Sequence, residues 1–223
     1  MAVLAKSDGV GEECSRVASS IRWPTCPPRL IEPANPKKAS PWTHKPVCLE
    51  AELLGSGIPE LCVYTASKFN RKGISFVVTP NSAIHALEKV QNSTAVQMAR
   101  SRFTPGKPPY QIKYIPEKGK GAVATRLIQP FEVFMEDFPS LVVDNLGGWA
   151  PEDDAPREHM NRLLSVAADQ LGDRERVLSL ATSGRDTNIV ADVIATNSFG
   201  IDLNGRDHKG LYPEISVSTF ASG

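Results

Sequence analysis

Residues 117–144 of this chain read EKGKGAVATRLIQPFEVFMEDFPSLVVD, and the predicted fold depends on this stretch. Gly119 and Gly121 bracket Lys120, which predicts a tight turn between two strands because glycine lets the backbone turn sharply. Short apolar runs at 122–124, 133–135 and 141–143 predict three strands joined into a compact β unit. A charged surface hairpin is the alternative interpretation, since a Gly-x-Gly pattern is common in unrelated proteins.

A second stretch, residues 194–216, reads IATNSFGIDLNGRDHKGLYPEIS and supplies a partner for the first. Together the two stretches resemble the SET domain of protein-lysine methyltransferases, in the form with a helical insertion found in SET-and-MYND and many fungal SET-domain proteins. The matching pieces are Gly119-Lys120-Gly121, Ala124-Thr125-Arg126, the Glu132-Val133 strand start, Asn197-Ser198-Phe199 and Gly210–Ser216. Their order and separation over roughly residues 108–216 carry the resemblance.

The resemblance implies methyl transfer from S-adenosylmethionine to a lysine of a protein substrate. Lys118, Gly119, Lys120 and Gly121 match the family's cofactor loop, where a cation and close backbone approach suit the cofactor's polar groups. Asn197, Ser198 and Phe199 match the segment that lines the target-lysine channel. The alternative for Phe199 is a buried aromatic at a helix end, and Tyr212 is expected to pack rather than to catalyse.

The sequence departs from the family after Pro-Glu-Ile-Ser. It contains no Asn-His-Ser/Asp-Cys segment, and no cysteine follows Cys62. We therefore assign no catalytic residue, leave open whether the chain is an enzyme, and expect a truncated, inactive member of the family. Val217-Ser218 can be encoded GTG-AGT, a splice-donor form, so an unspliced intron is our hypothesis for the truncation. The alternative function is a non-catalytic module that binds a protein partner.

Composition restricts the other function classes. Lys+Arg and Asp+Glu both number 25, and a formal net charge of zero argues against a non-specific nucleic-acid binder. No P-loop, Gly-x-Ser-x-Gly or His-Glu-x-x-His motif occurs. No apolar window is long enough for a membrane span. Lys6, Ser7 and Asp8 interrupt the apolar run that a secretory signal needs, so we expect an intracellular protein, or a secreted one if a leader is missing.

All the cysteines lie in the first 62 residues, at Cys14, Cys26, Cys48 and Cys62. They contain no Cys-x-x-Cys pair, so we expect no metal site. Four free thiols in a reducing compartment are the preferred interpretation. Disulfides are the alternative, because the fungal proteins that this region resembles often carry pairable cysteines.

The chain is predicted to divide into a proline-rich, largely disordered leader at 1–46, a strand–strand–helix segment at 47–107, the SET-like region at 108–216 and a divergent tail at 217–223. Strands are predicted at 62–65, 74–79 and 110–114. A helix capped by Thr79 is predicted to bury Ala83, Leu87 and Val90. Helices around 160–171, 174–181 and 188–197 would form the insertion at about 150–200, with Ile189, Val193 and Ile194 inward. The predicted fold class is α+β.

Overall fold

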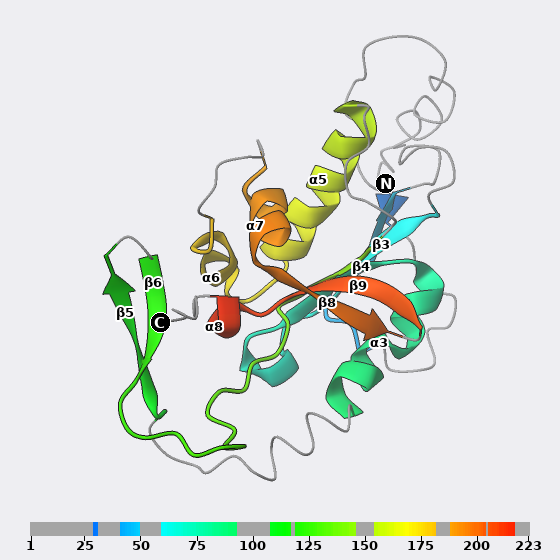
Figure 1. Ribbon diagram of the computed structural model, residues 1–223. Coiled ribbons are helices and arrows are strands. Elements are labelled where there is room, and N and C mark those ends of the chain that lie inside the picture. The colour runs from blue at the N-terminus through cyan, green and yellow to red at the C-terminus, as the bar shows by residue number, and fades with distance from the viewer. Residues whose placement is uncertain are drawn as a thin grey trace, which may run out of the picture.

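A computed structural model describes residues 29–30, 41–49, 59–92, 108–116, 119–145, 154–181, 188–203 and 205–216. These form a mixed α+β fold, which confirms the predicted class (Figure 1). The strands are β1 Arg29–Leu30, β2 Val47–Leu49, β3 Leu61–Ala66, β4 Ile74–Val78, β5 Tyr110–Ile115, β6 Gly119–Ala124, β7 Leu141–Asp144, β8 Ser198–Leu203 and β9 Arg206–Leu211. The helices are η1 Phe69–Arg71, α3 Pro80–Asn92, α5 Asp154–Asp169, α6 Arg174–Leu178, α7 Ile189–Asn197 and α8 Pro213–Ser216.

The large sheet contains seven strands in the order β1-β2-β3-β4-β7-β9-β8. β4 and β7 pair in parallel, while the other neighbours are antiparallel. Every residue of these two central strands is buried, as expected for strands covered on both faces. The sheet crosses the domain boundary predicted between residues 107 and 108, because β4 precedes it and β7 follows it.

Helices cover both faces of this sheet (Figure 1). Leu163, Leu164 and Ala167 of α5 join Val193 and Ile194 of α7 in one apolar core, which also receives alternate side chains of the strands. On the other face, α3 buries Ala83, Leu87 and Val90 in a second core, as predicted. The hydroxyl oxygen of Thr79 accepts a hydrogen bond from the Ser82 amide at 3.3 Å, which confirms the predicted cap.

Strands β5 and β6 form a separate two-stranded hairpin (Figure 1). This arrangement confirms the alternating strand at 110–114 but corrects the predicted turn. Gly119, Lys120 and Gly121 lie inside β6, opposite Ile115, Tyr114 and Lys113. The predicted compact three-stranded unit is also wrong, because β6 and β7 belong to different sheets.

The segment between β6 and β7 is not a strand, so the predicted strand at 133–135 and its start at Glu132-Val133 are wrong. A turn at Pro130 and Phe131 precedes it, and Pro139 follows it. Phe134 instead packs edge-to-face against Tyr110, with ring centroids 6.4 Å apart. Contact with the hairpin thus replaces strand pairing for this apolar run.

The helices of the predicted insertion are present, with one side chain misassigned. Ile189 is 53% exposed, whereas Val190, Val193 and Ile194 are buried. Asn188 accepts a hydrogen bond from the Ala191 amide at 3.0 Å, so Ile189 is the first helical residue and lies outside the core. No helix in the part of the chain that the structure describes is long and apolar enough to cross a bilayer.

A disulfide joins Cys48 to Cys62, so the preferred interpretation of free thiols is wrong for these two cysteines. The two residues face each other directly in the antiparallel register of β2 and β3. Sequence spacing does not reveal such a register. Cys14 and Cys26, like most of the leader at 1–46 and the tail at 217–223, lie outside the described residues.

Candidate functional site

The end of β9 and the short helix α8 form the centre of the candidate site. Gly210 lies opposite Phe199 of β8, and an added Cβ at Gly210 would come 2.9 Å from the Tyr212 ring. The absence of a side chain at Gly210 therefore lets Tyr212 lie across the strand. Phe199 and Tyr212 pack edge-to-face with ring centroids 6.0 Å apart, which supports the expected packing role of Tyr212.

Phe199 is 46% exposed, so the alternative of a buried aromatic at a helix end is wrong. The side chains of the two preceding residues form hydrogen bonds with backbone carbonyl oxygens. Asn197 donates to the Leu180 carbonyl oxygen at 3.1 Å, and Ser198 donates to the Ile194 carbonyl oxygen at 2.6 Å. Of the three residues predicted to line a substrate channel, Phe199 thus has the side chain most available to a ligand.

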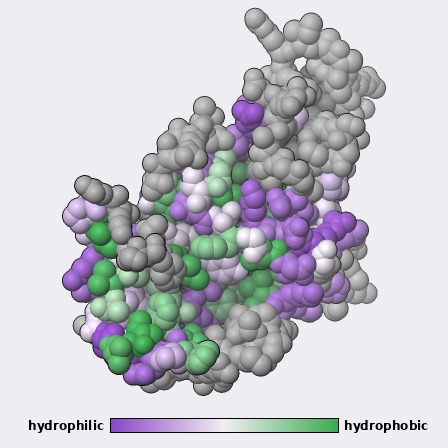
Figure 2. Space-filling view, viewed as in Figure 1, coloured by the Kyte–Doolittle hydropathy of each residue, from purple (hydrophilic) through white to green (hydrophobic). Residues whose placement is uncertain are grey.

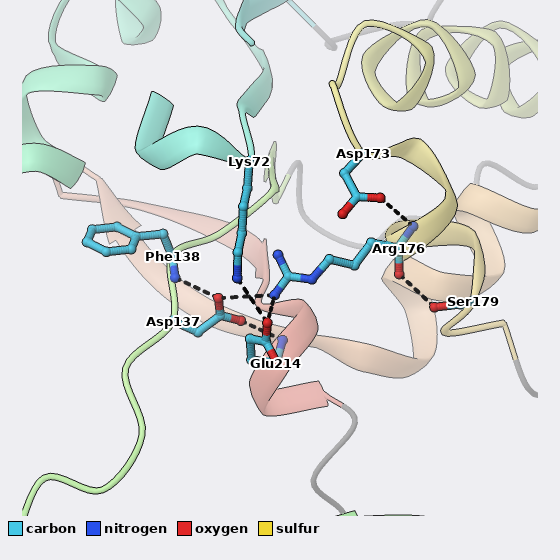
Figure 3. Close-up of polar contacts among 7 residues, drawn as sticks. All are labelled: Lys72, Asp137, Phe138, Asp173, Arg176, Ser179 and Glu214. Carbon is cyan, nitrogen blue, oxygen red and sulfur yellow. Dashed lines mark hydrogen bonds and ion pairs between the residues drawn. The ribbon is translucent and has the colours of Figure 1, made fainter. Parts of the chain in front are cut away.

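An ionic cluster of Lys72, Asp137, Arg176 and Glu214 holds α8 in place (Figure 3). Asp137 is nearly buried, with a side chain 3% exposed, and it accepts from the Glu214 amide at 2.7 Å and from the Phe138 amide at 2.9 Å. Lys72 and Arg176 both donate to Glu214 Oε1, at 2.9 and 2.6 Å. Four segments distant in the sequence therefore meet at one helix end.

Burial dominates the titration of Asp137. It raises the pKa of this carboxyl, although the amide of Glu214 and the charge of Arg176 act in the opposite direction. Burial also acts to raise the pKa of Glu214, but the hydrogen bond from Lys72 and the charge of Arg176 outweigh it, and this pKa is lowered. Within the cluster, the cations thus stabilise the charged form of Glu214, whereas burial disfavours the charged form of Asp137.

The hairpin approaches this cluster at its Tyr110 end. Burial raises the pKa of Tyr110, and the negative charges of Glu214 and Asp137 raise it further. Burial and the charge of Asp137 likewise raise the pKa of Tyr212. The Asp137 carboxylate thus acts both on Tyr110 of the hairpin and on Tyr212, which lie about a hundred positions apart in the chain.

The residues predicted to bind the cofactor lie along the hairpin. Gly119, Lys120 and Gly121 belong to β6, and Lys118 lies outside the described residues. Ser198 lines a cavity of about 450 Å³ together with Asp202, Asp207 and Lys209 of the β8–β9 hairpin, and none of its lining residues belongs to β6. Gly121 and Phe199 belong to different sheets, and the hairpin approaches the ionic cluster through Tyr110 rather than through its glycines.

A hydrogen-bonded turn follows the hairpin. The Glu132 amide donates to the Gln129 carbonyl oxygen at 3.0 Å, and Phe131 within this turn has a φ of +64° and is 96% exposed. Arg126 binds both carboxylate oxygens of Glu132, at 3.1 and 2.5 Å. The Arg126 hydrogen bond, followed by that from the Gln129 amide, lowers the pKa of Glu132 to about 2.

The sequence did not reveal the ionic cluster, because Lys72, Asp137 and Arg176 lie in separate segments of the chain and meet only through the fold. Among the described residues, Cys48, Cys62 and Glu60 are the one group with metal-ligand chemistry, and the disulfide occupies both sulfurs. No family model matches the chain, no curated protein is detectably similar to it, and no solved structure matches it.

Proposed function

We propose that this chain is a SET-type protein, related to the S-adenosylmethionine-dependent protein-lysine methyltransferases, and that it carries the methyl-donor and target-amine surfaces of that family. The observation that supports the proposal is the position of Tyr110, in the glycine hairpin, beside the Asp137 and Glu214 carboxylates next to Tyr212. Tyr110 pairs with Ala124 of the matching Ala124-Thr125-Arg126 segment, and Tyr212 belongs to the matching Gly210–Ser216 segment. The sequence contains no Asn-His-Ser/Asp-Cys segment, and no residue is assigned a catalytic role.

The chemistry of β6 fits the polar end of the cofactor. The Thr125 amide donates to the Pro109 carbonyl oxygen, which fixes which residues of the hairpin bond to each other. Hydrogen-bonded and non-hydrogen-bonded positions alternate along an antiparallel pair, so the amides and carbonyls of Lys120, Ala122 and Ala124 point to the outer edge of β6. A carboxylate ligand suits this edge, because the outward amides and the Lys120 ammonium can donate hydrogen bonds to it. Gly121 has no side chain to block its approach.

When bound, S-adenosylmethionine supplies an electrophilic methyl group on a sulfonium sulfur. The Lys120 side chain and the outward amides of β6 would hold its carboxylate. Phe199 and Tyr212 would form an apolar wall beside the target amine and exclude water from it.

Calorimetric titration of the full chain with S-adenosylmethionine tests the proposal. Gly121→Val keeps a good strand former in β6 but fills the space beside the backbone, so it should weaken binding about tenfold or more. Gly200→Val is the matched control, because an added Cβ at Gly200 meets no atom within 4 Å, and it should leave binding unchanged. No binding by the parent chain, or equal binding by Gly121→Val, would refute the proposal.

A non-catalytic interaction module is the second candidate, and the exposed turn favours it. Phe131 has a left-handed backbone conformation that bulky residues rarely adopt, and Leu127, four residues earlier, is 77% exposed. An exposed apolar turn of this kind suits insertion into a pocket of a protein partner. The same titration separates the candidates, because such a module needs no cofactor.

A further inference from the structure

The outer edge of β5 has no partner strand among the described residues, and two hydrophobic side chains of this strand are exposed. Among the described strands, β5 pairs only with β6. Ile112 is 42% exposed and Tyr114 is 75% exposed. Figure 2 shows hydrophobic atoms gathered at the lower left of the molecule, over the hairpin and the segment that follows it. Isolated two-stranded hairpins are marginally stable in water, and open edges tend to pair with another chain.

The hydrogen-bond pattern of the hairpin identifies the free backbone groups. Pro109 and Thr125 form a hydrogen-bonded pair, at 2.8 Å. Hydrogen-bonded and non-hydrogen-bonded positions alternate along an antiparallel pair, so residues 111, 113 and 115 bond to β6. The amides and carbonyls of Tyr110, Ile112 and Tyr114 therefore point to the open edge, and all three residues have a donor.

We propose that two copies of this chain associate through these edges, β5 against β5 in antiparallel orientation, with Ile112 of each copy on the twofold axis. This register places Tyr110 opposite Tyr114 of the second copy and uses all three open residues of each strand. The hairpins then form one four-stranded sheet with no edge left between them. The inference does not depend on the proposed function.

Charge and proline positions select this register over its neighbours. In the chosen register Gln111 faces Lys113 of the second copy, so no like charges oppose each other. A shift by one pair in one direction places Lys113 opposite Lys113 of the second copy and brings Pro116, which has no amide hydrogen, into the hydrogen-bonded set. A shift in the other direction brings in Pro108 and loses a pair.

A second copy of the chain fits the open edge of β5 better than a lipid bilayer does. Backbone amides and carbonyls need hydrogen-bonding partners, which lipid tails lack. The strand is also self-complementary about Ile112, as an interface between identical chains with twofold symmetry requires. Both features favour a second copy of the same strand.

Sedimentation velocity of the full chain over a range of concentrations tests the proposal with variants that carry opposite charges at residue 112. Ile112→Lys and Ile112→Glu each place like charges on the twofold axis, and each should raise the dimer dissociation constant about tenfold or more. An equimolar mixture of the two variants should restore the dimer. Ile189→Lys is the control, because Ile189 has a similar exposure on α7, and its dimer should persist.

Hydrogen exchange separates this dimer from any other association. In the dimer the amides of residues 110, 112 and 114 should gain protection as concentration rises, whereas those of residues 111, 113 and 115 should be protected at every concentration. A chain that stays monomeric at high concentration would overturn the proposal. So would a dimer that tolerates Ile112→Lys, or a mixture of Lys and Glu variants that stays monomeric.

Discussion

Removal of the Asp137 carboxylate should destabilise the protein strongly, because this buried group accepts two backbone hydrogen bonds, from Glu214 and Phe138. A hydrogen bond to a charged acceptor contributes about 1.5 kcal/mol at the lower end of its range, so Asp137→Ala should lower the free energy of unfolding by about 3 kcal/mol. With a denaturant slope of about 2 kcal/mol per molar urea, the unfolding midpoint should fall by about 1.5 M.

Urea denaturation followed by far-UV circular dichroism measures this change. Asp169→Ala is the matched control, since its carboxylate pairs with Arg174 at the surface, and it should change stability by no more than about 0.5 kcal/mol. If Asp137→Ala shifted stability no more than Asp169→Ala, the carboxylate would not hold α8 and the reasoning would be refuted.

The pH dependence of the same residue has a definite sign. The pKa of Asp137 is raised, so its titration contributes stability that is fully present below the ordinary value of 3.8 and is lost as the pH rises through the folded value. Asp137→Asn cannot ionise, and its stability curve should lack this descent. A parent curve with the opposite slope in that range, relative to the variant, would contradict the assignment.

Three further predictions follow from named contacts. Phe131→Gly should raise the free energy of unfolding by about 1 kcal/mol, because glycine adopts the left-handed conformation without strain; an unchanged or lower thermal midpoint would argue against it. Replacing both Cys48 and Cys62 by alanine should lower stability by about 3 kcal/mol, as expected for a loop closed over a separation of 14 residues, and chemical denaturation with and without reductant measures it. The Glu132 carboxyl should titrate near pH 2 by NMR, so the turn should keep its ion pair until the pH falls through that value, and Arg126→Gln should move the midpoint up toward 4.5.

The local elements could be predicted from the sequence where periodicity and capping agree. Strand β4 and helix α3 followed from an apolar run, Thr79 and the spacing of Ala83 and Leu87. The apolar run at 133–135 was misread, because its pattern does not distinguish a strand from an extended segment that packs on a neighbouring aromatic ring. Local patterns thus gave the identity of elements but not which sheet each one joins.

The candidate site was less accessible to sequence reasoning. Arg176 and Glu214 are 38 positions apart, and Asp137 and Glu214 are 77 apart, so no motif of fixed spacing contains them. The disulfide was hidden for the same reason, since the register of β2 and β3 decides which cysteines meet. Contacts that depend on tertiary register need the fold before they can be named.

The parallel pairing of β4 with β7 has a consequence for synthesis on the ribosome. β4 ends at Val78, and its inner neighbour begins at Leu141, so more than sixty residues must be translated between them. During that interval the nascent sheet exposes a largely apolar edge strand at what will become its middle. The protein should therefore be a client of co-translational chaperones, with its greatest need between the emergence of these two strands.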